Sequence, residues 1–198
     1  MGLIKDIVVS SALDKVINKL DERSEKNEKK LFKKPLGAGL LLIEQDSPVW
    51  RKAFVAYDEN RHVKYTVKGK LASRRYRLNF YDVHGNLLGT IKENARSPFS
   101  LDVEINGMEL GKVRFIGWTS YEVCFNGWRI ESNVLGTKYK ILNGKEEIAK
   151  ISWKWHDCGG SYVVNYADMR NELLMLMLVL TVDAAKAQSA RNAARSSG

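Results

Sequence analysis

The sequence predicts a mainly β protein: a closed antiparallel barrel of twelve strands that encloses a hydrophobic C-terminal helix and follows an extra N-terminal amphipathic helix. Two observations carry this prediction. Twelve candidate strands, separated by turn signals, follow one another between residues 39 and 166. The segment that starts at Glu172 is apolar on all sides across its first turns, and such a helix has to be buried all round. In a chain made mostly of strands, the inside of a closed barrel is the place that surrounds a helix.

Length, composition and charge bound the class of protein. The chain has 198 residues, of which 44% are apolar and 28% are charged, which favours one folded domain with short extensions and excludes a wholly disordered or collagen-like chain. It carries 32 Lys and Arg residues against 23 Asp and Glu residues, a net charge of +9, and this balance suggests anionic partners. Two cysteines, Cys124 and Cys158, are too few for a disulfide scaffold and fit a reducing compartment.

The first part of the chain is expected to form an amphipathic helix. Val9, Leu13, Val16 and Leu20 fall on one helical stripe, and the residue before Pro35 resists helical geometry. Three roles stay open for this helix: packing on the barrel rim, recruiting a partner protein, and lying on an anionic membrane. The chain then divides into the N-terminal helix with a basic linker (1–35), the barrel domain (36–188, with its central helix at 172–188) and a flexible tail (189–198).

Hairpin turns mark the boundaries between the predicted strands. The clearest are His84-Gly85, Asn106-Gly107, Asn126-Gly127 and Asn143-Gly144. Asn-Gly between apolar runs is a strong hairpin signal, because both residues accept a positive φ angle. Apolar and polar residues alternate between the turns, for example over residues 76–81, 101–105 and 121–125. Short strands joined by hairpins indicate an antiparallel barrel or sandwich.

The length of the apolar C-terminal segment fits a barrel interior. Residues 172–188 would span about 25 Å at about 1.5 Å per residue. Strands of seven or eight residues, at about 3.3 Å each, give a barrel of similar height. The longest apolar run, from Leu173 to Val182, is much shorter than the roughly 20 residues that a membrane-spanning helix needs. No transmembrane span is therefore expected.

Several of these segments resemble the LURP-one-related family. The resemblance is carried by residues 65–70, by 78–91 with the Asp82-Val83-His84-Gly85 turn, by 151–155 followed by 161–164, and by the apolar helix with its terminal Asp183. It covers roughly residues 36–188. That family is similar in fold to the tubby C-terminal domain and to phospholipid scramblases, so the resemblance implies a twelve-stranded barrel threaded by a C-terminal helix.

One basic stretch is the candidate binding site. Five cations fall within ten residues: Lys68, Lys70, Arg74, Arg75 and Arg77. Such a cluster can bind the phosphate groups of lipid headgroups or of nucleic acid. The alternative is a solvated strand face whose basic residues deter sheet aggregation. Tubby-like proteins bind phosphoinositides through basic strand residues, but their positions do not match this sequence one by one, so the resemblance assigns no site residue here.

Catalytic and metal-binding patterns are not visible. The three histidines, His62, His84 and His156, lie in different segments, and none has a nucleophile at a suggestive spacing. His156-Asp157-Cys158 is the only cluster of potential metal ligands in the sequence, whereas a structural zinc site needs four ligands in paired spacing. We therefore expect no enzymatic activity, no metal and no cofactor.

The predicted function is a non-enzymatic binding module of the LURP-one-related and tubby-like class. It would recognise anionic lipid headgroups of the phosphoinositide kind, or a similar polyanion, through a basic barrel face. One alternative is a protein-interaction or scaffold protein that recruits its partner through the N-terminal helix. A weaker alternative is nucleic-acid binding. The expected location is the cytoplasm, peripheral at a membrane surface when headgroups are bound.

Overall fold

The computed structural model describes residues 36, 39–45, 53–69, 76–94, 96–97, 100–117, 120–133, 136–156 and 159–196. The predicted N-terminal amphipathic helix lies outside the described residues, and the roles considered for it stay predictions.

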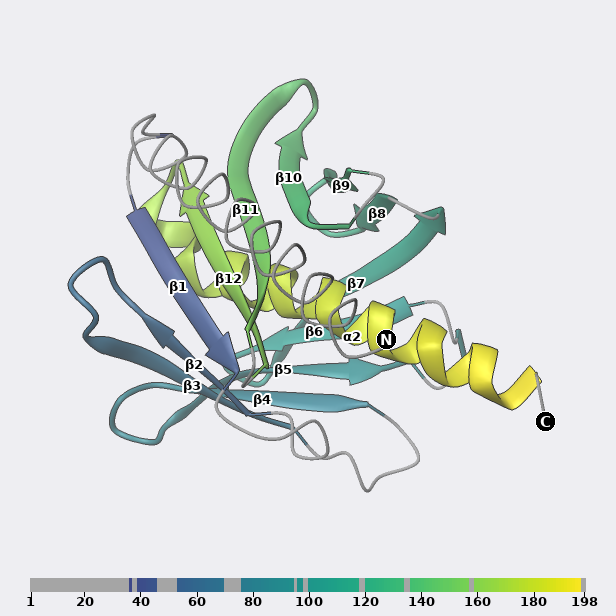
Figure 1. Cartoon of the computed structure of the whole chain (residues 1–198), viewed down its shortest axis with the longest axis horizontal. Helices are drawn as coiled ribbons and strands as arrows, with labels where there is room; N and C mark the ends of the chain where they lie inside the picture. Colours follow the sequence, from purple (N-terminus) through teal and green to yellow (C-terminus); the bar gives the residue numbers. More distant parts are fainter. Residues whose placement is uncertain are drawn as a thin grey trace, which may run out of the picture. The chain divides into compact units, whose positions relative to one another are not determined.

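A closed antiparallel barrel of twelve strands makes up most of the described chain (Figure 1), which confirms the predicted barrel. Each strand pairs with its neighbours in sequence, and β12 closes the barrel by pairing with β1. The strands are β1 (Gly39–Gln45), β2 (Ala53–Tyr57), β3 (Val63–Gly69), β4 (Arg77–Tyr81), β5 (Leu87–Glu93), β6 (Ser100–Ile105), β7 (Met108–Gly117), β8 (Ser120–Val123), β9 (Trp128–Ser132), β10 (Lys138–Asn143), β11 (Glu146–His156) and β12 (Gly159–Tyr166).

The hydrophobic helix lies inside this barrel, as predicted. A short 3-10 helix, η1 (Met169–Asn171), leads from β12 into α2 (Glu172–Ser196), which runs through the barrel (Figure 1). Every residue of α2 from Leu174 to Val182 is at most 9% exposed, because inward side chains of the strands surround it. Leucine and methionine favour helix, so the local preference of this segment and its burial agree.

The helix is longer than the sequence analysis predicts. It continues to Ser196, whereas the sequence analysis places the end of the helix at residue 188 and a flexible tail over 189–198. Residues 184–194 contain six alanines and neither glycine nor proline. Alanine has the highest helix propensity of all residues, so nothing in this stretch ends the helix.

The barrel has two distinct ends, because successive antiparallel strands place alternate turns at opposite ends. The entry end, where α2 begins, carries the turns 58–62, 82–86, 106–107, 124–127 and 144–145, together with η1. The exit end is where α2 leaves. The turn 106–107 has the geometry that its Asn-Gly pair predicts, with positive φ angles of 50° at Asn106 and 77° at Gly107.

Candidate anion-binding face

The structure places two of the five predicted site residues on neighbouring strands. Lys68 lies on β3 and Arg77 lies on β4, and both are exposed. Their chain neighbours Val67 and Leu78 are fully buried, so strand alternation directs Lys68 and Arg77 to the outer face of the barrel. Lys70, Arg74 and Arg75 lie outside the described residues.

The pairing of β3 with β4 brings Lys68 and Arg77 together. Lys68 lies opposite Asn79, and Arg77 is two residues from Asn79 on the same face of β4. The two cations are therefore diagonal neighbours, the relation in which long side chains of adjacent strands can meet a common ligand. We call these two cations with Asn79 the β3–β4 basic face.

Neutral groups hold both cations of the β3–β4 basic face. The Arg77 Nε donates a hydrogen bond to Asn79 Oδ1 at 3.2 Å. The hydroxyl of Thr90, which is only 2% exposed, donates to the same oxygen at 3.3 Å. The Lys68 ammonium lies 5.4 Å from the centre of the Tyr81 ring, within the range of a cation–π contact. These contacts orient the two side chains without neutralising them.

Many other cations on the outer surface are paired with carboxylates. The ion pairs are Lys92–Glu104 at 3.3 Å, Arg114–Glu122 at 3.4 Å, Arg129–Glu131 at 2.7 Å, Lys140–Glu147 at 2.9 Å and Lys150–Glu147 at 2.8 Å. Within the described part of the chain, Lys68 and Arg77 take part in no such pair. The β3–β4 basic face therefore has two cations on adjacent strands that lack a carboxylate partner among the described residues.

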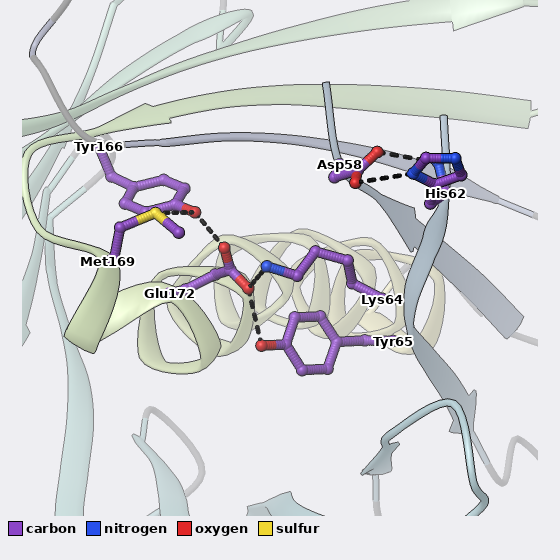
Figure 2. A network of polar contacts seen from close by, with 7 residues as sticks. All are labelled: Asp58, His62, Lys64, Tyr65, Tyr166, Met169 and Glu172. Atoms are coloured by element: carbon purple, nitrogen blue, oxygen red, sulfur yellow. Dashed lines mark hydrogen bonds and ion pairs between the residues drawn. The ribbon is translucent and has the colours of Figure 1, made fainter. Parts of the chain in front are cut away.

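A second polar cluster closes the entry end of the barrel around Glu172 (Figure 2). Glu172 is the first residue of α2 and is 6% exposed. Its Oε1 accepts a hydrogen bond from the Tyr65 hydroxyl at 2.8 Å and lies 2.5 Å from the Lys64 ammonium. Its Oε2 accepts a hydrogen bond from the Tyr166 hydroxyl. Three donors from two strands thus converge on one carboxylate.

In this cluster Glu172 is ionised and the two tyrosines are protonated. Burial on its own would raise the pKa of Glu172, but the hydrogen bonds from Lys64, Tyr166 and Tyr65 outweigh burial and hold that pKa below its usual value. Burial, reinforced by the hydrogen bond to Glu172, raises the pKa of both tyrosines, which stay protonated donors. An ionised, saturated carboxylate at a helix N-terminus anchors the helix. We therefore assign Glu172 a structural role.

Glu172 has no role that the sequence alone predicts. The available signal is its position, an acid directly before a segment that is apolar on all sides. Its partner Tyr65 lies 107 residues away in the chain, and no local pattern connects two such distant positions.

A different arrangement holds α2 near the exit end. The Lys186 ammonium donates a hydrogen bond to the carbonyl oxygen of Gly136 at 2.9 Å and lies 5.0 Å from the centres of the Tyr139 and Trp153 rings. Asp183 accepts a hydrogen bond from the Tyr162 hydroxyl at 3.1 Å. Burial lowers the pKa of Lys186. These contacts fix the helix to β10, β11 and β12.

The histidines are not gathered in one place. The His62 Nδ1 lies 3.3 Å from Asp58 Oδ2 in the exposed turn 58–62 (Figure 2), and His84 lies in the exposed turn 82–86. The side chain of His156 is not among those described. No group of three or more His, Cys, Asp or Glu residues that could hold a metal ion occurs in the described ranges. Within the same ranges, no helix is both long enough and apolar enough to cross a membrane.

Comparison with known proteins decides the family. The sequence model of the LURP-one-related family matches residues 40–183. The chain belongs to the LURP-one-related family. The match begins in β1 and ends at Asp183 of α2, so Lys68, Arg77 and Glu172 all lie within the LURP-one-related part of the chain.

Two relatives are similar over most of their own length. YxjI, an uncharacterized protein of Bacillus subtilis (strain 168), is 21% identical over 147 residues, which are 72% of this chain and 91% of that protein. A protein of Arabidopsis thaliana with a solved X-ray structure superposes with a TM-score of 0.55 at 13% identity, over 75% of this chain and 92% of that one. At this identity, the second likeness concerns the fold alone.

Proposed function

We propose that this LURP-one-related protein is a non-enzymatic binding module that recognises anionic lipid headgroups of the phosphoinositide kind, or a similar polyanion, through the β3–β4 basic face. One observation supports the proposal most strongly. Lys68 and Arg77 are exposed neighbours on the rigid wall of a closed barrel, and neither has a carboxylate partner among the described residues.

The chemistry of the two side chains suits a phosphate group. Arg77 uses its Nε for Asn79, and its two terminal nitrogens make no hydrogen bond within the described part of the chain. A guanidinium can hold two phosphate oxygens at once through such a pair of nitrogens. Lys68 adds a compact positive charge beside it. The chain that joins β3 to β4 carries three further cations, Lys70, Arg74 and Arg75.

The size of the expected effect follows from the charge count. Each Lys or Arg close to an anionic membrane surface contributes about 1 kcal/mol of binding free energy. Replacing Lys68 and Arg77 together is therefore expected to weaken vesicle binding by roughly 30-fold, since about 1.4 kcal/mol corresponds to tenfold.

Co-sedimentation with phosphatidylcholine vesicles tests the proposal. Pelleting should increase when phosphoinositide is added to the vesicles and decrease as salt is raised, because salt screens exposed charges. The double variant Lys68→Ala, Arg77→Ala should lose this pelleting. The matched control, Lys140→Ala with Lys150→Ala, removes the same charge from two lysines that share the Glu147 carboxylate, and it should lose much less binding than the Lys68→Ala, Arg77→Ala variant.

Two results would contradict the proposal. One is the absence of lipid-dependent pelleting at low salt. The other is an equal loss in the two double variants, which would mean that only the total charge of the chain matters. Competition by a soluble inositol polyphosphate and by a DNA duplex then separates a headgroup site from a general polyanion site.

A further inference from the structure

A second surface, at the entry end of the barrel, combines exposed apolar side chains with negative charge. Four apolar side chains project from two neighbouring hairpins, the β4–β5 and β6–β7 turns. We call them the apolar rim: Val83 is 58% exposed, Leu87 52%, Met108 66% and Leu110 38%. Exposed apolar side chains that gather on adjacent hairpins can mark an interaction surface.

The hairpins that carry the apolar rim are adjacent. The amide nitrogen of Asn106 donates a hydrogen bond to the carbonyl oxygen of Leu88 at 2.8 Å. Ile105 lies opposite both Gly89 and Met108, and it packs against the barrel core. Leu87 on β5 and Met108 on β7 therefore lie on either side of β6, whose partly buried Ile105 pairs with both strands.

The β4–β5 turn is held in place by its own side chains. Asp82 Oδ1 accepts hydrogen bonds from the backbone nitrogens of His84 at 2.9 Å and Asn86 at 2.8 Å. The β6–β7 turn is a tight hairpin in which Asn106 and Gly107 both adopt positive φ. The apolar rim is thus a preformed surface, and a partner would not have to order it.

Acidic residues lie in the hairpins that carry the apolar rim and in the turn that precedes them in the sequence. The three successive turns of β2–β3, β4–β5 and β6–β7, with the first residues of β7, contain the acids Asp58, Glu59, Asp82 and Glu109. The cation in these turns, Arg61, is paired with Glu44 at 2.8 Å. Hydrogen bonds from the His62 backbone and from the Asn86 side chain lower the pKa of Asp58 and of Asp82 respectively, so both stay ionised. These three turns are therefore acidic in a chain whose net charge is +9.

We propose that the apolar rim is a docking surface for a partner protein segment that carries apolar side chains next to lysines or arginines. Apolar contacts with Leu87 and Met108 would provide most of the binding, and the surrounding acids would select a basic partner. The acids also repel an anionic membrane, so this surface is distinct from the β3–β4 basic face. The inference does not depend on the headgroup proposal.

Three synthetic peptides of equal length and identical leucine positions test the docking surface. Their remaining positions are lysine, glutamate or serine. Each peptide is titrated into the isotope-labelled full chain, and the NMR shifts are mapped. The leucine–lysine peptide should give saturable shifts at residues 82–87 and 106–110 and should bind more weakly as salt is raised. The leucine–glutamate peptide should give none there.

Two variants and one control test whether the side chains of the apolar rim bind the peptides. Leu87→Ser with Met108→Ser should weaken the leucine–lysine peptide by about tenfold or more, as loss of a central apolar contact usually does. Glu109→Lys should weaken the lysine peptide and strengthen the glutamate peptide, a gain that misfolding cannot produce. Ile116→Ser is the control, because Ile116 is equally exposed, at 52%, but lies at the end of β7 near the exit end.

The proposal is overturned if the lysine and glutamate peptides bind alike, if the shifts fall outside the rim, or if Ile116→Ser weakens binding as much as the rim variant does. Self-association that the Leu87→Ser, Met108→Ser variant abolishes would also overturn it, because the occupant would then be a second copy of this chain. Sedimentation of the unmodified chain over a range of concentrations measures that outcome.

Discussion

Two pairs of outward-facing cations lie on the same barrel and differ in one group. Lys140 and Lys150 lie opposite each other on β10 and β11, and Glu147 forms an ion pair with both. Lys68 and Arg77 lie as diagonal neighbours on β3 and β4, with the amide of Asn79 opposite Lys68 and hydrogen-bonded to Arg77. The first pair shares a carboxylate, whereas among the described residues only neutral groups contact the second pair.

This difference separates a structural arrangement from a binding arrangement. A carboxylate between two cations satisfies them, and an incoming phosphate would have to displace it. A neutral amide fixes the geometry of Arg77 and leaves its charge for a ligand. Counting cations along the sequence does not distinguish the two pairs. The difference is whether a carboxylate or an amide contacts the cations.

The largest expected effect concerns a different carboxylate, the buried Glu172. Glu172→Ala should lower the free energy of unfolding by about 3–5 kcal/mol. The substitution leaves the Lys64 ammonium and two tyrosine hydroxyls at the entry end without their acceptor. Removing the surface carboxylate in Glu147→Ala should cost at most about 1 kcal/mol. Urea unfolding of the two variants measures both values. Equal losses would contradict the anchoring role of Glu172.

The same anchor predicts a pH dependence. The folded-state pKa of Glu172 lies below its usual value of 4.5, so the unfolded chain takes up a proton first as pH falls. The stabilisation by Glu172 is therefore complete above that usual value and is lost as pH falls through the folded-state pKa. The difference in unfolding free energy between the unmodified chain and Glu172→Gln should shrink in acid. A difference that is constant with pH would contradict it.

Asn79→Asp should make the β3–β4 pair resemble the β10–β11 pair. The new carboxylate would lie opposite Lys68 and within reach of Arg77, and it would compensate the charge that the headgroup meets. Binding to phosphoinositide vesicles should fall by roughly tenfold or more, given about 1 kcal/mol for each cation involved. Asn79→Ala keeps the charge and removes the hydrogen bond to Arg77, so it should weaken binding by no more than a few-fold. Unchanged binding by Asn79→Asp would mean that headgroups do not bind at the β3–β4 basic face.

Glu147→Gln is the reciprocal change. It frees Lys140 and Lys150, and vesicle binding should rise by up to about tenfold. The effect should be smaller than that of Asn79→Asp, because two lysines lack the paired nitrogens of an arginine. A gain of binding cannot come from misfolding, so an unchanged or weaker affinity would contradict the role given to the intervening carboxylate.

The smallest effect is expected at Thr90. Thr90→Val keeps the shape of the side chain and removes the hydroxyl that donates to Asn79 Oδ1. Arg77 would then be held less firmly, and headgroup binding should weaken by a few-fold, in line with the loss of about one neutral hydrogen bond. A stability measurement accompanies the binding assay, because Thr90 is buried.

Much of the fold follows from local patterns in the sequence. A segment that is apolar on all sides predicts the enclosed helix, and the Asn106-Gly107 pair predicts its hairpin. The approach of Lys68 to Arg77 also follows, since the two lie on successive strands of a meander. The end of α2 is less predictable from the sequence, because the alanine-rich stretch to Ser196 contains no residue that would stop a helix.

The compensation of charge could not be predicted, because it depends on register. Regular alternation would place Glu147 on the face opposite to Lys150. A shift of register between Ile141 and Leu142 instead sets Glu147 opposite Leu142, and the bulge brings its carboxylate to both lysines. The cluster around Glu172 likewise depends on strands that are distant in the chain.

Shift mapping with a soluble inositol polyphosphate shows which of the two cation pairs binds the phosphate groups. The isotope-labelled chain is titrated at low salt, and the resonances of β3, β4, β10 and β11 are followed together. We expect saturable shifts centred on Lys68, Arg77 and Asn79, with little change at Lys140 and Lys150; the opposite outcome would refute the β3–β4 basic face as the binding site. Shifts of equal size at both cation pairs, or shifts confined to other strands, would also refute it.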